Sequence, residues 1–299
     1  MPRAARLFDS PRPAILPIRT AMKIRTHLSL ATPLLAAALV ASSACAQDPA
    51  SAQAQAQAQA RTSSEPGEPR AVGDLRLRDF AVKWMVQQDD LAQVGYYREA
   101  NRTALASSDA RPRIVLMGDS ITFHWTPEHL PAPGSLNLLN RGIPGQNTTQ
   151  MLLRFEDDVV ALKPTAMVLL AGTNDLRAYE GDPAAAAPEI IARVARNVTA
   201  MVDIAQGRGI QVILCAVPPI GTDRARLARD PATIVKLNAW LQSFAQSREL
   251  PFVDFYAVLA DANRDLPGRL SADGIHPNPE GYRLMWPRLR AAFEQIGLR

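Results

Sequence analysis

After Arg111 the sequence alternates between short apolar runs and longer segments whose apolar residues recur every three or four positions. Short runs rich in Val, Ile and Leu are typical of strands buried on both faces, and the spaced segments are typical of amphipathic helices. This alternation favours an α/β fold with about five parallel strands and helices on both faces. The predicted strands are 114–117, 136–139, 166–171, 212–217 and 252–255, and the predicted helices are 152–162, 191–205, 234–244 and 282–296.

Residues 1–46 differ from the rest and predict a signal peptide. Two basic residues after Met22 precede an apolar stretch that ends at Val40, and Ala44-Cys45-Ala46 has the A-x-A pattern of a cleavage site. The apolar stretch is too short for a membrane anchor. We therefore expect a mature chain that begins near Gln47, is secreted or periplasmic, and is not inserted in a membrane. Residues 1–21 add nothing that a leader needs, so the true start is expected at Met22.

Cys45 offers an alternative, in which it is acylated and the protein is a lipoprotein. We favour simple cleavage, because a lipoprotein signal has leucine where Ser42 stands. With Cys45 removed, Cys215 is a single thiol in an apolar run, and the mature chain has no internal disulfide.

The charge of the mature chain gives no indication of a nucleic-acid or membrane-surface partner. Residues 47–299 hold 27 basic and 28 acidic residues, a net charge of about −1, so the sequence pI of 9.3 belongs to the precursor. Such a balance supports neither a nucleic-acid partner nor a charged membrane surface as partner.

The mature chain divides into three predicted parts. Residues 47–72 have low complexity and predict a flexible linker. Residues 73–110 predict one or two helices that pack on the main domain, which we place at 111–299. The helical stripe consists of Leu91, Val94, Tyr97, Ala100 and Ala104.

Ser120 follows the first predicted strand in Gly-Asp-Ser, where open α/β sheets place their chemistry. A serine in this position can instead cap the next helix. A serine nucleophile needs a base. His276 is the best candidate among the three histidines of the mature chain, since Asp273 stands three residues before it and can hold its ring. The other two are His124 and His129.

Two more loops follow predicted strands and carry glycine and amide residues. They read "NRGIPGQNTTQ" after the second strand and "AGTNDLR" after the third. Backbone N–H groups and amide side chains in such loops can stabilise the oxyanion formed during acyl transfer. No spacing of histidine or cysteine suggests a metal, and no glycine-rich loop suggests a nucleotide, so we expect no cofactor.

The blocks "GDSI", "GIPGQNT", "GTND" and "DGIHP", in this order, resemble those of the SGNH hydrolase superfamily, the GDSL esterases and lipases. The resemblance covers about residues 111–299 and implies a flavodoxin-like three-layer α/β/α fold. It also implies a triad of Ser120, Asp273 and His276. The implied oxyanion donors are the backbone N–H groups of Ser120 and Gly145 and the side chain of Asn174.

The resemblance implies supporting roles in loop shape for Asp119, Gly172 and Asp175. One departure is that Ile121 replaces the leucine that follows the serine in the family. The chain is thus expected to be a serine esterase that cleaves small-molecule or glycan esters through an acyl-enzyme. Lipase or lysophospholipase activity, acyl transfer to a sugar and a non-catalytic envelope protein are the alternatives, and the oligomeric state stays open.

Short acyl groups are expected because no long apolar insertion interrupts the four blocks. The loop 218–231 is long enough to overhang the site but carries three arginines and two aspartates, which predicts a charged, hydrated rim.

Overall fold

Five parallel strands form the centre of the structure, a computed structural model that describes residues 90–126, 129, 134–177, 182–221 and 229–298. The predicted leader and linker lie outside these residues. The strand order is β2-β1-β3-β4-β5, and every neighbouring pair is parallel. The strands are β1 (Arg113–Gly118), β2 (Asn137–Gly142), β3 (Ala166–Leu170), β4 (Gln211–Cys215) and β5 (Phe252–Val253). The predicted parallel sheet is confirmed.

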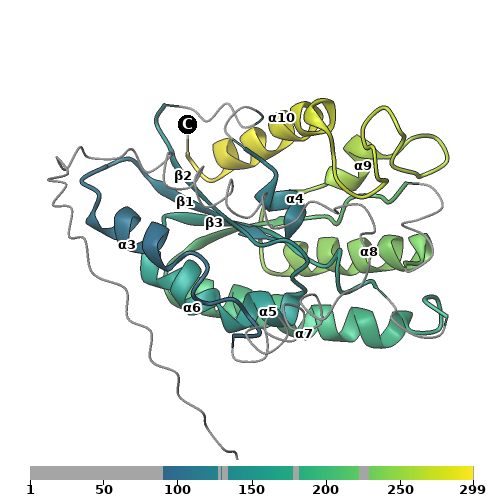
Figure 1. Cartoon of the computed structure of the whole chain (residues 1–299), viewed down its shortest axis with the longest axis horizontal. Helices are drawn as coiled ribbons and strands as arrows, with labels where there is room; N and C mark the ends of the chain where they lie inside the picture. The colour runs from purple at the N-terminus through teal and green to yellow at the C-terminus, as the bar shows by residue number, and fades with distance from the viewer. Residues whose placement is uncertain (1–89, 127–128, 130–133, 178–181, 222–228, 299) are drawn as a thin grey trace, which may run out of the picture. The chain divides into compact units, whose positions relative to one another are not determined.

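Helices cover both faces of this sheet, so the fold has the predicted three layers (Figure 1). One face is covered by α3 (Arg98–Ala106), α5 (Thr148–Leu153), α6 (Phe155–Asp158), the 3₁₀ turn η1 (Val160–Leu162), α7 (Ala187–Gly207) and α8 (Pro231–Ser247). The other face is covered by α4 (Ser120–Phe123), α9 (Phe255–Leu259) and α10 (Pro279–Gln295). Among the described residues, no helix is long and apolar enough to span a membrane.

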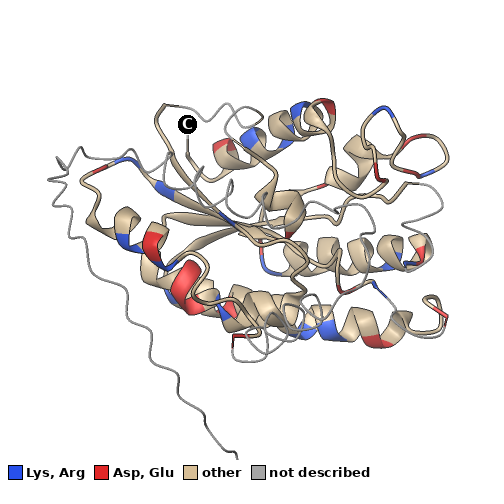
Figure 2. Ribbon diagram, viewed as in Figure 1, with Lys and Arg blue, Asp and Glu red and all other residues tan. Residues whose placement is uncertain are grey.

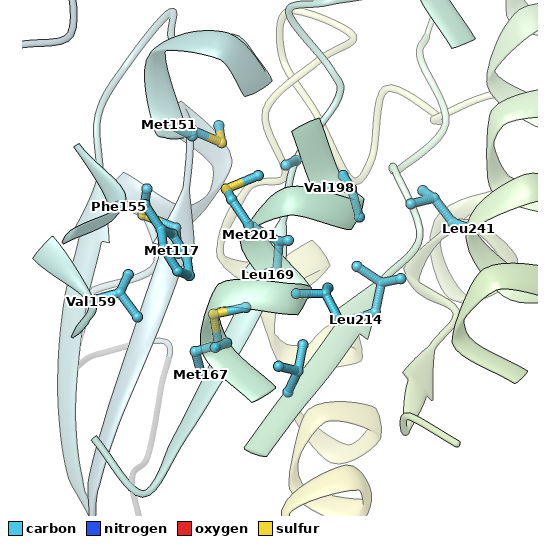
Figure 3. Packing of buried hydrophobic residues seen from close by; sticks show 14 of the residues in the cluster. Met117, Met151, Phe155, Val159, Met167, Leu169, Val198, Met201, Leu214 and Leu241 are labelled. Atoms are coloured by element: carbon cyan, nitrogen blue, oxygen red, sulfur yellow. The ribbon is translucent and has the colours of Figure 1, made fainter. Parts of the chain in front are cut away.

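Side chains that alternate along the strands supply two cores. In β1, Val115 and Met117 pack into one core, and Ile114 and Leu116 pack into the other. Figure 3 shows the first core, where strand residues meet side chains of α5, α7 and α8. Each large apolar side chain buried in this way contributes about 1.5–3 kcal/mol. Charged residues of both signs lie mainly over the helices and loops, as Figure 2 shows.

The register of the sheet brings three loops to one edge. Gly118 lies opposite Gly142 of β2 and Leu170 of β3, so β1, β2 and β3 end at the same level. The strand order reverses between β1 and β3, which is where open α/β sheets bind ligands. Gly142 has to be a glycine, because a Cβ there would lie 2.2 Å from the backbone nitrogen of Phe123 in α4. The chain can therefore place α4 and Ser120 directly over this edge.

The segment 152–162, predicted as one helix, is divided into the end of α5, α6 and η1. The chain turns at Arg154, whose guanidinium points inward and is fully buried. It donates to the Gly118 carbonyl at 3.1 Å and to the Gln146 side chain at 2.6 Å. The apolar spacing alone predicts a continuous helix here, because it carries no information about these tertiary contacts.

Of the predicted helical stripe between Leu91 and Ala104, only the part in α3 is helical. Residues 90–97 form turns in which the Asp90 side chain accepts the N–H groups of Val94 and Gly95. Leu91, expected on the packed face, is 53% exposed. Tyr97, which belongs to the same predicted stripe, is buried, and its hydroxyl donates to the Gly142 carbonyl at 2.5 Å. Residues 73–89 of the predicted extension lie outside the described residues, so its bounds stay a prediction.

Candidate active site

Ser120 is the first residue of α4, immediately beyond the end of β1. The helix cap is Asp119, whose Oδ1 accepts the N–H of Ile121 at 2.9 Å. Ser120 is therefore not the capping residue, and its hydroxyl has another partner. Burial raises the pKa of Asp119 to about 6, against the opposing effect of the Ile121 hydrogen bond.

The hydroxyl of Ser120 lies 2.8 Å from Nε2 of His276, and Nδ1 of the same ring lies 2.5 Å from Oδ2 of Asp273. An ionised carboxylate can only accept, so Nδ1 carries a proton, and in the neutral ring Nε2 is then the atom that can accept from the serine. Three groups that are up to 156 positions apart in the chain are thus connected by two hydrogen bonds.

The loop that carries Asp273 and His276 is tightly held. Oδ1 of Asp273 accepts the N–H groups of Ile275 and His276, both at 2.9 Å. Gly274 has a φ of +76°, and the N–H of Gly221 donates to its carbonyl at 2.6 Å. Partial burial raises the pKa of Asp273, but the hydrogen bonds from His276 and Ile275 outweigh it and lower the pKa to about 2. The carboxylate is therefore charged at neutral pH.

Asn174 and Gly145 come from the loops after β3 and β2, and they line one cavity together with Ser120. The Asn174 side chain donates to the Gln146 carbonyl at 3.1 Å. An amide nitrogen carries two protons, and the second N–H makes only a longer contact, at 3.5 Å, with Oδ2 of Asp119. Gly145 has a φ of +79°, which a residue with a side chain rarely adopts.

The other supporting residues fix these loops. Asp175 accepts the backbone N–H and the hydroxyl of Thr148, at 2.9 and 2.6 Å, and so joins the loop after β3 to the start of α5. Burial raises the pKa of Asp175, against the hydrogen bonds from Thr148. Gly172 has a φ of +125°, and a Cβ there would come within 3.0 Å of Val217. Both residues are positioned to hold loop shape.

The cavity beside Ser120 has a volume of about 430 Å³. Its lining includes residues that sequence reasoning missed, namely Gln93, Tyr96, Phe123, Ile143, Arg177 and Arg229. Gln93 and Tyr96 come from the segment before β1, so this segment forms part of the cavity wall. Arg229 was expected on an exposed rim, but only 2% of it is exposed, and that expectation is wrong for this residue. Residues 222–228 of that loop lie outside the described residues.

The remaining histidines lie elsewhere around the site. The ring of His124 meets the ring of His276 edge to face at 5.5 Å. The ring of His129 stacks on Tyr282 at 5.8 Å. Within the part of the chain that the structure describes, no group of three or more His, Cys, Asp or Glu could hold a metal ion.

Comparisons with known proteins identify the family of the chain. The model of the GDSL-like lipase/acylhydrolase family matches residues 116–284. The uncharacterized lipoprotein YqeF of Bacillus subtilis is 35% identical over 178 residues, which are 51% of this chain and 72% of that protein.

Two solved structures from Bacteroides are also similar. An acylhydrolase candidate from Bacteroides fragilis is 32% identical with a TM-score of 0.59, and a GDSL-like lipase from Bacteroides thetaiotaomicron is 30% identical with a TM-score of 0.58. Each comparison covers 69% of this chain and 98% of the other. Because the family match spans more than half of the chain, from β1 to α10, the protein belongs to the GDSL-like lipase/acylhydrolase family, in agreement with the SGNH resemblance.

Proposed function

We propose that this protein is a serine esterase in which Ser120 attacks the ester carbonyl and forms an acyl-enzyme. The single observation that carries the proposal is the pair of hydrogen bonds from Ser120 through His276 to Asp273, beside a cavity. Membership of an acylhydrolase family supports the same chemistry.

In the first half of the reaction, Nε2 of His276 takes the proton of Ser120 while Oγ bonds to the carbonyl carbon. The carbonyl oxygen becomes an oxyanion. The bond from carbon to the alcohol oxygen then breaks, and His276 returns the proton to the departing alcohol. Asp273 stabilises the imidazolium that exists between these two transfers.

In the second half, a water molecule takes the place of the alcohol. His276 removes a proton from the water as its oxygen attacks the acyl carbon, and the bond to Ser120 breaks. His276 then gives the proton back to Oγ, so the carboxylic acid leaves and the enzyme is regenerated.

The oxyanion is stabilised by three donors, which are the N–H groups of Ser120 and Gly145 and the side chain of Asn174. Gly145 and Asn174 line the same cavity as Ser120, which supports these roles. Donors that are already in place act strongly because they need no reorganisation as charge develops.

The substrate that we propose is an ester of a short acyl group with a polar alcohol, such as an O-acetyl group on a carbohydrate. A cavity of about 430 Å³ is at the small end of the roughly 300–1,000 Å³ typical of ligand sites. Its walls combine apolar Phe123 and Ile143 with polar Gln93 and cationic Arg177. Such walls fit a small, hydrated substrate better than a long alkyl chain.

Acetyl and butyryl esters are therefore expected to be cleaved with a much higher kcat/KM than palmitoyl esters. The test is a series of p-nitrophenyl esters from C2 to C16, each below its aggregation limit, followed by acetylated glycans. The Ser120→Ala variant, measured in parallel, gives the background of spontaneous hydrolysis. A kcat/KM that rises steadily to C16, or a sharp gain in activity when a long-chain ester is raised above its aggregation limit, would contradict the proposed substrate.

We also infer that the protein acts outside the cytoplasm after its leader is cleaved. The A-x-A pattern at residues 44–46 and the lipoprotein name of the Bacillus subtilis relative support export. Mass spectrometry of the protein from its native host is expected to find an N-terminus at Gln47. A diacylated Cys45 at the N-terminus would overturn cleavage after Ala46 and make the protein a lipoprotein.

A further inference from the structure

Arg229 lies in the segment between β4 and α8, directly before Asp230, which caps α8. Its guanidinium is buried and lines the cavity that contains Ser120. Nε donates to the Thr173 carbonyl at 2.9 Å, and one terminal nitrogen donates to Oδ1 of Asn174 at 3.3 Å. A buried cation thus contacts both the backbone and the side chain of the loop that follows β3.

These contacts fix which way the amide of Asn174 faces. A guanidinium has donors only, so the Asn174 atom beside it has to be the oxygen. On the opposite side, Nδ2 donates to the Gln146 carbonyl at 3.1 Å and lies 3.5 Å from a carboxylate oxygen of Asp119. The donor from Arg229 and the acceptors on the other side therefore favour the same orientation.

We propose that Arg229 is a positioning residue that holds the Asn174 amide with its N–H directed toward the oxyanion. The inference rests on the proposed role of Asn174 as an oxyanion donor. A charge-assisted hydrogen bond is stronger than a neutral one, and it also withdraws electron density from the amide, which makes Nδ2–H a better donor. Arg229 itself does not contact the reacting atoms.

The proposal predicts a specific pattern of kinetic effects. Arg229→Met keeps an unbranched side chain but removes the donors, and it is expected to lower kcat by about ten- to a hundred-fold with little change in KM, because a displaced donor is mainly felt in the transition state. Arg229→Lys keeps a charge and a donor, and should recover part of the loss.

A double-mutant cycle with Asn174 separates positioning from substrate binding. Asn174→Ala alone should lower kcat by about a hundred- to a thousand-fold, as the loss of one oxyanion donor typically does. In the Asn174→Ala background, Arg229→Met should then lower kcat by less than about two-fold, because there is no amide left to position. If Arg229 bound the substrate directly, Arg229→Met would lower kcat/KM by the same factor in both backgrounds and would raise KM.

Thermal unfolding of every variant shows whether it folds. If Arg229→Met does not fold, Arg229→Lys and Arg229→Gln are compared in the same two backgrounds. Independent effects of Arg229 and Asn174, a raised KM, or unchanged kcat in Arg229→Met and Arg229→Gln would each overturn the inference. An active Ser120→Ala would instead overturn the proposed function, so the two failures are distinguishable.

Discussion

Replacing Ser120 with alanine is expected to lower kcat by roughly a million-fold, which is the scale of loss when a serine nucleophile is removed. The variant should still bind substrate, because the cavity walls and the proposed oxyanion donors remain. Its KM or binding constant is therefore expected to change far less than kcat. Steady-state hydrolysis of p-nitrophenyl acetate, with thermal unfolding as a check on the fold, measures both.

His276→Ala is expected to cause a similar loss, and the double variant Ser120→Ala/His276→Ala should be no worse than either single one. The two residues act as a unit, so their effects do not add. His124→Ala is a matched control, since its ring lies 5.5 Å from that of His276 in the same cavity. Its effect is expected to be smaller by orders of magnitude. Near-normal activity in His276→Ala together with lost activity in His124→Ala would show that the base was assigned wrongly.

Replacing Asp273 with asparagine is expected to lower kcat by about ten thousand-fold, less than the loss of Ser120 or His276. The asparagine oxygen can still accept the N–H groups of Ile275 and His276, so the loop should keep its shape. Its amide nitrogen, however, favours the tautomer with the proton on Nε2 of His276, which cannot accept the serine proton. Measurement of kcat and of the thermal midpoint separates this electronic effect from unfolding.

The lowered pKa of Asp273, about 2, also predicts how the site responds to pH. A pKa below the ordinary value of 3.8 means that the folded protein favours the ionised form. The contribution of Asp273 to stability is therefore present above pH 3.8 and is lost as the pH falls toward 2. Between pH 5 and 9, kcat/KM should therefore show no change that is caused by titration of Asp273. Full activity in Asp273→Asn would contradict the proposed tautomer role.

The sheet was predictable from local patterns, and the central residues of the site were predictable from short motifs that resemble those of the SGNH hydrolases. Runs of four to six mainly apolar residues mark the five strands, and parallel strands bring their carboxyl ends to one edge. The structure brings together Ser120, His276 and Asp273, which the motifs "GDSI" and "DGIHP" had selected from opposite ends of the domain. Their catalytic roles are predictions, which the variants above test.

Contacts that depend on tertiary acceptors were not predictable from the sequence. An arginine in a polar loop is typical of the surface, yet Arg229 is buried because the Thr173 carbonyl and the Asn174 side chain accept its protons. Arg154 is likewise fully buried, and it lies where the structure divides a segment that the apolar spacing predicts to be one helix. Tyr96 lies in a stretch of turns that the apolar spacing predicts to be helical. Nothing in the local sequence therefore indicated that Tyr96 lines the cavity.

Labelling with a fluorophosphonate tests the central claim most directly, because this reagent phosphonylates an activated serine and needs no knowledge of the natural substrate. After digestion, peptide mass spectrometry is expected to find a single adduct on Ser120, formed in step with the loss of esterase activity. Ser120→Ala should form no adduct, and His276→Ala should react far more slowly. An adduct on a different serine that abolishes activity, or full activity without any adduct after prolonged labelling, would contradict Ser120 as the nucleophile.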